Sequence, residues 1–245
     1  MSNSIEVINL TKIFKSKYAV NKINFKINED EMVGLLGPNG CGKTTTIGMI
    51  LGLLKPTSGN VLINGSNIEK NKISLLSKMN FISPYIELPK KLTVKQNLIV
   101  YGKLYNVTKL DQRIDYLVDK LRLNELLNKM TGELSSGQKN RVSLAKALIN
   151  DPSVLLLDEP TASLDPETGD FVRTFLENYK KEKKISILLA SHNMDEVKRL
   201  CSSILMMKKG SIVDSGTPNG LITKYGRKNL EEVFLEIVRE KNEYY

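Results

Sequence analysis

The chain has 245 residues, 41% of them hydrophobic and 26% charged, which is the composition of an ordinary globular protein. No apolar run approaches the roughly 18 residues that cross a bilayer, and the first residues lack the charged-then-apolar pattern of a secretion signal, so we expect a cytoplasmic protein. The net charge of +9 comes from scattered lysines and does not by itself indicate nucleic acid, while two cysteines are too few for a disulfide framework.

Short strands are predicted in the first 36 residues. Residues 5–10 alternate loosely between apolar and polar, and Phe25-Lys26-Ile27 alternates clearly. Between these strands we expect a lysine-rich loop that carries Phe14 and Tyr18. Either ring could stack on an adenine, because every base offers a π-face, and ordinary packing is the simpler alternative for both.

A glycine-rich loop follows the apolar run Met32–Leu36. It reads Gly37-Pro38-Asn39-Gly40-Cys41-Gly42-Lys43-Thr44-Thr45, which has the spacing of a phosphate-binding loop. Apolar residues then recur at helical spacing, so the expected order is strand, loop and helix. The glycines let backbone N–H groups turn inward around a phosphate, and the helix start at Thr44 adds partial positive charge. Lys43 is expected to reach the β- and γ-phosphates and the Thr44 hydroxyl to ligate Mg²⁺, while Cys41 is expected to be a small passive side chain.

A mostly helical block is predicted to interrupt the strands. Before it, residues 61–63 read as a strand that ends at the turn Asn64-Gly65. Thr93 and Gln96 have capping-box spacing at the start of a helix, and residues 111–127 carry apolar residues at helical spacing. Residues 93–150 therefore look helical, and we interpret them as part of an inserted subdomain.

A second helix start with anion-binding features lies at the end of this block. The sequence there is Leu134-Ser135-Ser136-Gly137-Gln138-Lys139-Asn140-Arg141, and Ser135 and Gln138 again have capping-box spacing. The N-terminus of this helix offers serine hydroxyls and backbone N–H groups to an anion. A helix that is merely well capped explains the same spacing equally well.

Apolar strands and helical stretches alternate after residue 150, which favours an α/β fold with a parallel sheet. The strand Val154–Leu157 ends in Asp158-Glu159-Pro160, so Asp158 is placed to hold Mg²⁺ and Glu159 to polarise a water against the γ-phosphate. The strand at residues 185–190 is followed by His192, the single histidine, at the edge where α/β folds bind ligands. Residues 204–207 form a further strand, and residues 229–241 a terminal amphipathic helix.

Together these motifs resemble the nucleotide-binding subunit of an ABC transporter over about residues 5–217. Five motifs match in order: the phosphate loop resembles Walker A, residues 134–138 the family signature, residues 155–159 Walker B, residues 162–165 the D-loop, and His192 the switch histidine. Ser136 stands where the signature usually has glycine. A Walker A loop alone occurs in many NTPases, whereas the ordered set is highly specific. No guanine-specific Asn-Lys-x-Asp is present, which speaks against a GTPase.

The resemblance implies a P-loop NTPase (RecA-like) core with an N-terminal antiparallel β subdomain and an inserted helical subdomain. We expect an ATPase domain over residues 1–226, with the helical subdomain at about 86–150, and a C-terminal amphipathic helix over 227–245. The resemblance implies that two copies, or one copy and a homologous subunit, face each other head to tail. ATP and Mg²⁺ bind Walker A of one copy, and Ser135, Gly137 and Gln138 of the other contact the nucleotide.

Further roles follow from the same resemblance. Asp165 is expected to bridge the copies, His192 to contact the γ-phosphate as a catalytic residue with Glu159 and Lys43, and Phe14 to stack on adenine with Tyr18 as the second choice. The family usually has a glutamine near residue 82, but this chain has Tyr85 at the expected place, so no residue is assigned that role. The subunit is expected at the cytoplasmic side of the membrane, attached to a separate permease.

Two stretches resemble the drug- and ion-exporting branch with a separate permease: Leu134 to Leu148, which reads Ser-Ser-Gly-Gln-Lys-Asn-Arg near its start, and the ending at residues 229–235. We therefore expect the chain to power export. A soluble ABC ATPase of translation or DNA repair is the alternative, although those relatives usually carry two ATPase domains or a long coiled coil. No nucleic-acid partner is expected.

Overall fold

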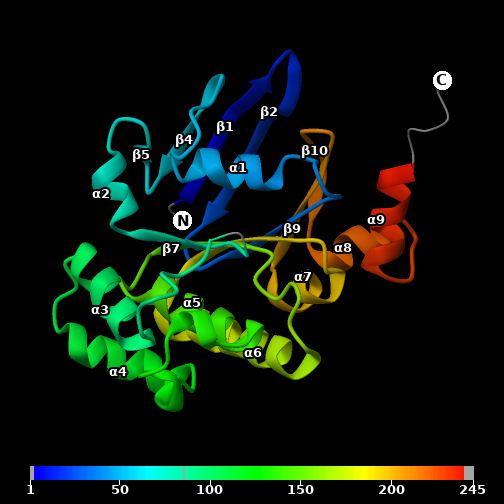
Figure 1. Ribbon diagram of the computed structural model, residues 1–245. Helices are drawn as coiled ribbons and strands as arrows, with labels where there is room; N and C mark the ends of the chain where they lie inside the picture. Colours follow the sequence, from blue (N-terminus) through cyan, green and yellow to red (C-terminus); the bar gives the residue numbers. More distant parts are fainter. Residues whose placement is uncertain (1–2, 85, 240–245) are drawn as a thin grey trace. The chain divides into compact units, whose positions relative to one another are not determined.

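The computed structural model describes residues 3–84 and 86–239, and Figure 1 shows their helices and strands, with labels for those that have room for one. The chain forms two compact units, one from residues 1–75 and 186–245 and the other from residues 76–185. In sequence, the second unit is therefore inserted between the two parts of the first. Tyr85 lies outside the described residues.

An antiparallel sheet of the first unit contains the N-terminal strands in the order β2-β1-β4-β5. The strands are β1 (Asn3–Phe14), β2 (Lys17–Asn28), β4 (Ser58–Ile63) and β5 (Ser66–Asn67). Along β2 the apolar residues alternate with exposed polar ones and face the core, as expected for a sheet with one wet face. The Asn64-Gly65 turn between β4 and β5 has positive φ at both residues, 47° and 74°, and so confirms the predicted hairpin turn.

The predicted loop around Phe14 and Tyr18 is wrong. Phe14 is the last residue of β1 and Tyr18 is the second residue of β2, because only Lys15 and Ser16 make the turn. Both turn residues have positive φ, 43° and 70°, which closes the hairpin in two residues and lets the strands run to its tip. Tyr18 pairs with Ile13 across the hairpin.

Parallel strands of the same unit surround the strand that precedes the glycine loop. This strand, β3 (Met32–Leu36), pairs in parallel with β8 (Ser186–Ser191) on one side and with β9 (Ser203–Lys208) on the other. β10 (Ser211–Gly216), which the sequence pattern did not indicate, pairs with β9 in antiparallel fashion. All five residues of β3 and all six of β8 are buried, as predicted from their continuous apolar runs.

Helices of the first unit cover these strands. They are α1 (Lys43–Ile50), α2 (Lys72–Leu76, which reaches the unit boundary), α7 (Met194–Leu200), α8 (Pro218–Lys224) and α9 (Leu230–Arg239). α7 packs so closely on β3 that a Cβ at Gly34 would lie 2.7 Å from Val197 Cγ1. α9 buries Leu230, Val233 and Ile237 as predicted, and Lys208 Nζ donates to the carbonyl oxygens of Ile237 and Val238 at its end. Residues 240 and 241 of the predicted helix lie outside the described residues.

The second unit contains a parallel strand pair and the predicted helices. β6 (Met79–Ile82) pairs with β7 (Val154–Asp158), and the helices are α3 (Val94–Leu104), α4 (Leu110–Lys120), α5 (Ser136–Leu148) and α6 (Pro166–Lys183). Short 3-10 turns lie at Asn124–Leu126 and Thr131–Glu133. α4 ends at Lys120 rather than near residue 127. Arg122 adopts a left-handed φ of 53°, with which a right-handed helix cannot continue. The predicted capping box of Thr93 and Gln96 is confirmed at α3.

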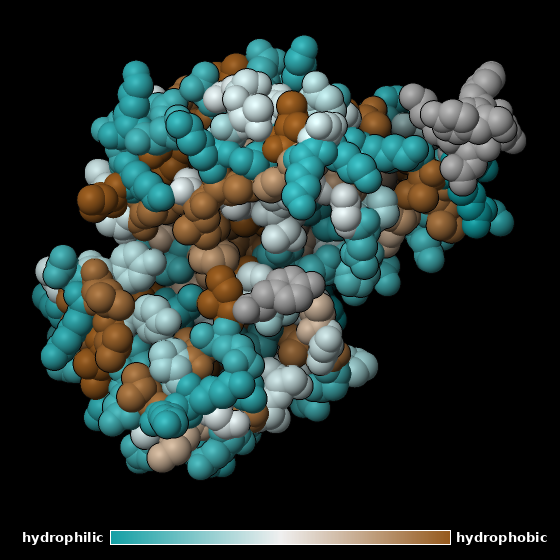
Figure 2. Space-filling model, turned by 45° about the horizontal axis from the view of Figure 1, so that its top comes forward, coloured by the Kyte–Doolittle hydropathy of each residue, from teal (hydrophilic) through white to brown (hydrophobic). Residues whose placement is uncertain are grey.

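Hydrophobic side chains on the face in Figure 2 occur in small groups among hydrophilic ones. The most exposed large apolar residues are Ile73 on α2 and Leu104 on α3. Within residues 3–84 and 86–239, no helix combines the length and the apolarity that crossing a membrane requires.

Candidate functional site

The glycine loop connects β3 to α1 and leaves the start of that helix uncapped by side chains. Gly42 is the N-cap residue with a left-handed φ of 114°, and α1 begins at Lys43, one residue before the predicted start. The first turn contains no acidic residue. Backbone N–H groups at a helix start have no partner within the helix, and they carry partial positive charge. This loop is therefore shaped to bind an anion such as a phosphate.

Close packing explains two of the loop's glycines. A Cβ at Gly37 would lie 2.3 Å from the Met207 carbonyl oxygen, and one at Gly42 would lie 2.4 Å from the Ala19 carbonyl oxygen. Neither position has room for a side chain, because backbone atoms of β9 and β2 press against the loop. The β1–β2 hairpin therefore helps to shape the loop.

Lys43 folds over the loop. Its Nζ donates to the carbonyl oxygens of Gly37 at 2.7 Å and Pro38 at 3.3 Å, and the residue is 7% exposed. Thr44, the next residue of the first turn, is exposed. Cys41 is buried behind the loop, and burial raises the pKa of its thiol against the opposing effect of the Lys43 charge. A protonated, buried thiol agrees with the passive role expected for Cys41.

The loop and His192 leave neighbouring strands at the same edge. β3 and β8 are parallel, and Leu36 at the end of β3 pairs with Ser191 at the end of β8. Gly37 and His192 are the next residues on these two strands, and His192 is exposed. The expected juxtaposition of the phosphate loop and the histidine is therefore present in the first unit.

A buried carboxylate holds the turn that carries His192. Ser191 Oγ donates to Glu196 Oε2 at 2.7 Å and accepts the Asn193 backbone N–H at 3.0 Å. Asn193 Oδ1 in turn accepts the backbone N–H of Glu196 and caps α7. Glu196 is 1% exposed. These bonds bracket His192 on both sides and fix the direction in which its backbone leaves β8.

Replacement of Glu196 by alanine is expected to lower the free energy of unfolding by about 1–3 kcal/mol, because a buried hydroxyl loses its acceptor. Urea denaturation followed by circular dichroism measures the change. Asp195→Ala, an exposed acidic residue in the same helix turn, is the matched control and should stay near wild type. Equal unfolding midpoints for the two variants would contradict the bracing role of Glu196.

Both candidate rings for adenine are accessible at the hairpin tip. Phe14 is 48% exposed and Tyr18 is 55% exposed, and Lys12 Nζ lies 5.1 Å from the centre of the Phe14 ring. Tyr18 directly precedes Ala19, whose carbonyl presses on Gly42. The two rings thus remain alternatives, with Phe14 favoured by the family pattern.

Phe14→Ala is expected to weaken ATP binding about tenfold, because loss of one base–aromatic stack is worth about 1–3 kcal/mol. Tyr18→Ala should have a smaller effect. Equilibrium titration of each purified variant with ATP measures the difference. A loss confined to Tyr18→Ala would reverse the assignment, and the preference for ATP over GTP should change little, since stacking tolerates any base.

The predicted carboxylates lie at a strand edge of the second unit. Asp158 is the last residue of β7 and is 3% exposed, while Glu159 follows it with a left-handed φ of 51°. Leu157 of β7 pairs with Ile82, the last residue of the parallel strand β6. Asp158, which follows Leu157, and Ser83, which follows Ile82, therefore lie side by side. Tyr85, in the stretch where the family usually has glutamine, lies outside the described residues.

The predicted capping box at the second helix start is confirmed. Ser135 Oγ accepts the Gln138 backbone N–H at 3.3 Å, and Gln138 Oε1 accepts the Ser135 backbone N–H at 3.0 Å. Gly137 is buried, and a Cβ there would lie 3.0 Å from Thr168 Cγ2 of α6. The first turn of α5 therefore packs against the first turn of α6, while Ser135 and Ser136 stay exposed.

Asp165 caps α6. Its carboxylate accepts the Thr168 backbone N–H at 2.9 Å, and this hydrogen bond lowers the pKa of the Asp165 carboxyl. The side chain is exposed, in keeping with the contact to a second copy that the family pattern implies.

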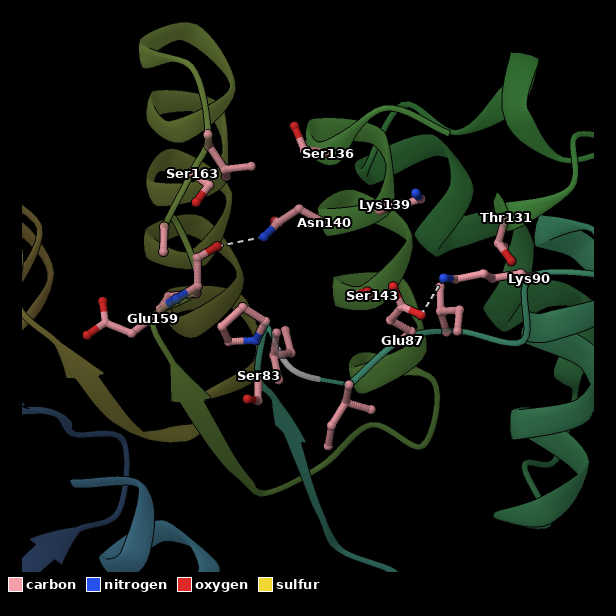
Figure 3. A pocket seen from close by; sticks show the side chains of 17 residues that line it. Ser83, Glu87, Lys90, Thr131, Ser136, Lys139, Asn140, Ser143, Glu159 and Ser163 are labelled. Carbon is pink, nitrogen blue, oxygen red and sulfur yellow. Dashed lines mark hydrogen bonds and ion pairs between the residues drawn. The ribbon is translucent and has the colours of Figure 1, made fainter. Parts of the chain in front are cut away.

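A cavity of about 300 Å³ lies within the second unit, and of the predicted site residues that the structure describes, Glu159 alone lines it. Figure 3 shows Glu159 on one side and Ser136, Asn140 and Ser143 of α5 on the other, with Asn140 directed at the turn after Glu159. Gly137 and Asp158 do not line this cavity. Its polar lining consists of Ser83, Glu87, Lys90, Thr131, Ser136, Lys139, Asn140, Ser143, Glu159 and Ser163.

The residues proposed for Mg²⁺ are a hydroxyl and a single carboxylate. Thr44 belongs to the first unit and Asp158 to the second. Among the described residues, no group of three or more His, Cys, Asp or Glu side chains could hold a metal ion. A sparse oxygen set suits Mg²⁺, which keeps several waters and is usually bound by one or two protein oxygens together with substrate phosphates.

Two polar contacts near the site were missed from the sequence. Glu196 had a signal, since Asn193 and Glu196 have the spacing of a helix N-cap and its third residue. Asn140 had none, because its partner is the carbonyl oxygen of Pro160, 20 residues along the chain.

Comparison with known proteins places these features in a family. The family model described as ABC transporter matches residues 20–162. The chain is 36% identical to the bacitracin transport ATP-binding protein BcrA of Bacillus licheniformis, covering 94% of this chain and 75% of that one. It is also 36% identical to the Nod factor export ATP-binding protein I of Rhizobium johnstonii, covering 89% and 71%. The osmoprotectant import ATP-binding protein OsmV of Salmonella typhimurium is 36% identical, covering 90% and 60%.

Solved structures agree with the sequence comparisons. The fold superposes on the structure of an ATP-binding subunit of an ABC transporter with a TM-score of 0.87 and 27% identity, covering 95% of this chain and 98% of that one. It also resembles a dimeric ATP-binding cassette in a post-hydrolysis state bound to ADP and phosphate, with a TM-score of 0.79 and 25% identity over 87% and 98% of the two chains.

Proposed function

The chain belongs to the ABC transporter family of ATP-binding proteins, and on this premise we propose that it powers export through a separate membrane permease. It binds and hydrolyses ATP, as its family and its similarity to ATPase cassettes indicate. The subunit would lie at the cytoplasmic side of the membrane, attached through the permease.

The observation that supports this mechanism is that one chain carries two helix starts whose features suit an anion. One is the uncapped start of α1 after Gly42, in the first unit, and the other is the exposed start of α5 at Ser135 and Ser136, in the second. We propose that each ATP lies between two subunits, which are two copies of this chain or one copy and a homologous subunit. One subunit provides the start of α1 and the other the start of α5. The dimeric cassettes among the similar structures support this arrangement.

The proposed catalytic groups divide the chemistry of hydrolysis. Lys43 and the loop amides hold the phosphates. Thr44 and Asp158 would hold Mg²⁺, which would neutralise negative charge on the phosphates. Glu159 orients a water and accepts its proton as the water oxygen bonds to the γ-phosphorus. The bond from that phosphorus to the β–γ bridging oxygen breaks, and ADP leaves with the bridging oxygen. His192 stabilises the charge on the γ-phosphate in the transition state.

Remaining contacts are assigned from the motif match. The loop contacts to nucleotide come from Gly37, Pro38, Asn39, Gly40, Cys41, Gly42 and Thr45, and Phe14 stacks on adenine. From the other copy, Ser135, Gly137 and Gln138 contact the γ-phosphate, and Asp165 bridges the copies. The Gln138 Oε1 atom and backbone N–H are both engaged in the capping box of α5, so the Nε2–H₂ group is the donor that this side chain would offer to the nucleotide.

Export is supported by relatives and by two stretches of sequence. BcrA is named for bacitracin transport and the Nod factor protein for export, although OsmV, named for import, has the same identity over a smaller share of its length. The stretches Leu134–Leu148 and residues 229–235 favour the exporting branch.

The decisive experiment is purification of the tagged chain from membranes in mild detergent, with identification of what accompanies it. A permease of several membrane-spanning helices is the expected companion, and ATP hydrolysis should rise when the complex is returned to lipid vesicles. ATP should drive movement of the permease's substrate away from the face that carries this subunit; movement toward that face would overturn export. A ribosome or a DNA-repair complex in place of a permease would overturn the transport role while leaving the ATPase chemistry intact.

A further inference from the structure

A hydrogen bond connects helix α5 to the turn that carries Glu159. Asn140 Nδ2, on the second turn of α5, donates to the carbonyl oxygen of Pro160 at 2.6 Å. Figure 3 shows this bond crossing one side of the cavity, with Glu159 next to the bonded carbonyl. Pro160 is buried, and a buried backbone carbonyl needs a donor. Asn140 supplies it from a helix that is 20 residues distant in sequence.

The turn itself is strained at Glu159. Its φ of 51° lies in the left-handed region, which is uncommon for residues other than glycine, asparagine and aspartate. The Ala162 backbone N–H donates to the Glu159 carbonyl oxygen at 3.1 Å and closes the turn from the far side. Strained backbone of this kind persists only where the surroundings hold it. The Asn140 bond at Pro160 is the side-chain contact that holds this turn from α5.

The start of helix α5 is fixed by its packing against helix α6. The first turn of α5 packs tightly against the first turn of α6, since a Cβ at Gly137 would lie 3.0 Å from Thr168 Cγ2. Asp165 caps α6 at the end of the same loop that begins at Glu159. Helix α5 therefore contacts the turn at Pro160 and the first turn of α6 at Thr168.

We propose that Asn140 is a positioning residue for Glu159: its bond to Pro160 sets the turn that aims the Glu159 carboxylate. The inference rests on the proposed role of Glu159 in hydrolysis. Ser135 caps α5, and its proposed contact is the ATP held by the other copy. Asn140 therefore also connects the position of one copy's Glu159 carboxylate to the helix that meets the other copy's nucleotide.

The donor is the part of the Asn140 side chain that matters. Asn140 Oδ1 is buried and has no hydrogen-bond partner among the described residues, so the acceptor half contributes no bond. An ionised aspartate has the same shape but only acceptors, so Asn140→Asp removes the donor with little change in volume. Asn140→Gln keeps the donor on a longer stem, and the adjoining cavity of about 300 Å³ has room for the added methylene.

The test compares steady-state ATP hydrolysis by the full chain carrying Asn140→Ala, Asn140→Asp or Asn140→Gln. We expect kcat to fall about tenfold or more in the first two, within the range that a well-placed general base contributes, while KM for ATP changes less than about twofold. Asn140→Gln should recover kcat to within about threefold of wild type. Asn178→Ala is the matched control, since Asn178 is an exposed asparagine on α6 without a side-chain hydrogen bond among the described residues.

A second readout separates positioning from loss of structure. In a Glu159→Gln background, Asn140→Ala should cause no further drop in the residual turnover, because a residue that acts only through Glu159 has nothing left to position. ATP-dependent dimer formation, measured by size-exclusion chromatography, should also persist in that double variant. Failure of Glu159→Gln alone to lower turnover would show that the proposed function, rather than the Asn140 inference, is at fault.

Three results would overturn the proposal once Glu159→Gln has behaved as expected. The first is wild-type kcat in any folded variant that lacks the donor. The second is that Asn140→Ala lowers turnover by the same factor in the wild-type and the Glu159→Gln backgrounds. The third is a rise in KM that accounts for the whole effect. If Asn140→Ala does not fold, the comparison of Asn140→Asp with Asn140→Gln decides the matter by the same criteria.

Discussion

Glu159→Gln should lower ATP turnover by two or more orders of magnitude and leave ATP binding intact. Glutamine keeps the shape of the side chain at the end of β7 but cannot accept a proton from the attacking water, and a positioned general base contributes about 10²–10⁴-fold. Because hydrolysis is blocked after binding, the variant should accumulate as an ATP-bound dimer. Phosphate release gives the turnover, and size-exclusion chromatography with and without ATP gives the dimer.

The same change at an exposed position provides the control. Glu167→Gln alters an exposed residue of the first turn of α6 and should keep wild-type turnover. Turnover by Glu159→Gln within a few-fold of wild type would remove Glu159 from the role of base. Loss of ATP binding together with turnover would indicate a damaged fold instead, which a thermal unfolding curve would reveal.

Lys43→Ala should act at an earlier step and weaken nucleotide binding itself. Loss of a hydrogen bond from a charged group costs about 1.5–3 kcal/mol, which corresponds to roughly 10–100-fold in the dissociation constant. In the structure the ammonium group already lies over the loop, on the carbonyl oxygens of Gly37 and Pro38, so it is held where the loop closes. Equilibrium dialysis with labelled ATP measures the change.

An exposed lysine outside the glycine loop provides the control for Lys43→Ala. Lys70→Ala removes an exposed lysine of the first unit and should leave the dissociation constant unchanged. Tight ATP binding by Lys43→Ala combined with lost turnover would contradict the binding role and assign Lys43 to the chemical step alone. The two variants thus divide the reaction, with Lys43 needed for binding and Glu159 for hydrolysis.

The parts of the fold that followed from the sequence are those specified by short-range rules. The loop from Gly37 to Thr45 combines a fixed glycine spacing with a buried strand before it and a helix after it. Ser135 and Gln138 satisfy each other within one helix turn, so their spacing alone predicted the contact. The buried strands β7 and β8 were visible as continuous apolar runs.

The parts that did not follow depend on backbone conformation or on distant partners. Neither Lys15 nor Ser16 is a glycine, the residue that usually indicates a two-residue hairpin turn. The positions of Phe14 and Tyr18 in strands were therefore not predicted. Arg122 ends α4 through a positive φ that its residue type does not suggest. Asn140 meets a carbonyl oxygen from another element, and no local pattern encodes such a contact.

Both parallel neighbours of β3 come from the far end of the chain. β3 ends at Leu36, but β8 and β9 begin only at Ser186 and Ser203. A ribosome adds about 5–20 residues per second, so the growing chain carries the Gly37–Thr45 segment for many seconds before those strands emerge. The inserted unit of residues 76–185 is complete in sequence by then. The nascent polypeptide therefore completes the sheet around its glycine loop only late in synthesis, and a chain cut short before β8 lacks the sheet that shapes the loop.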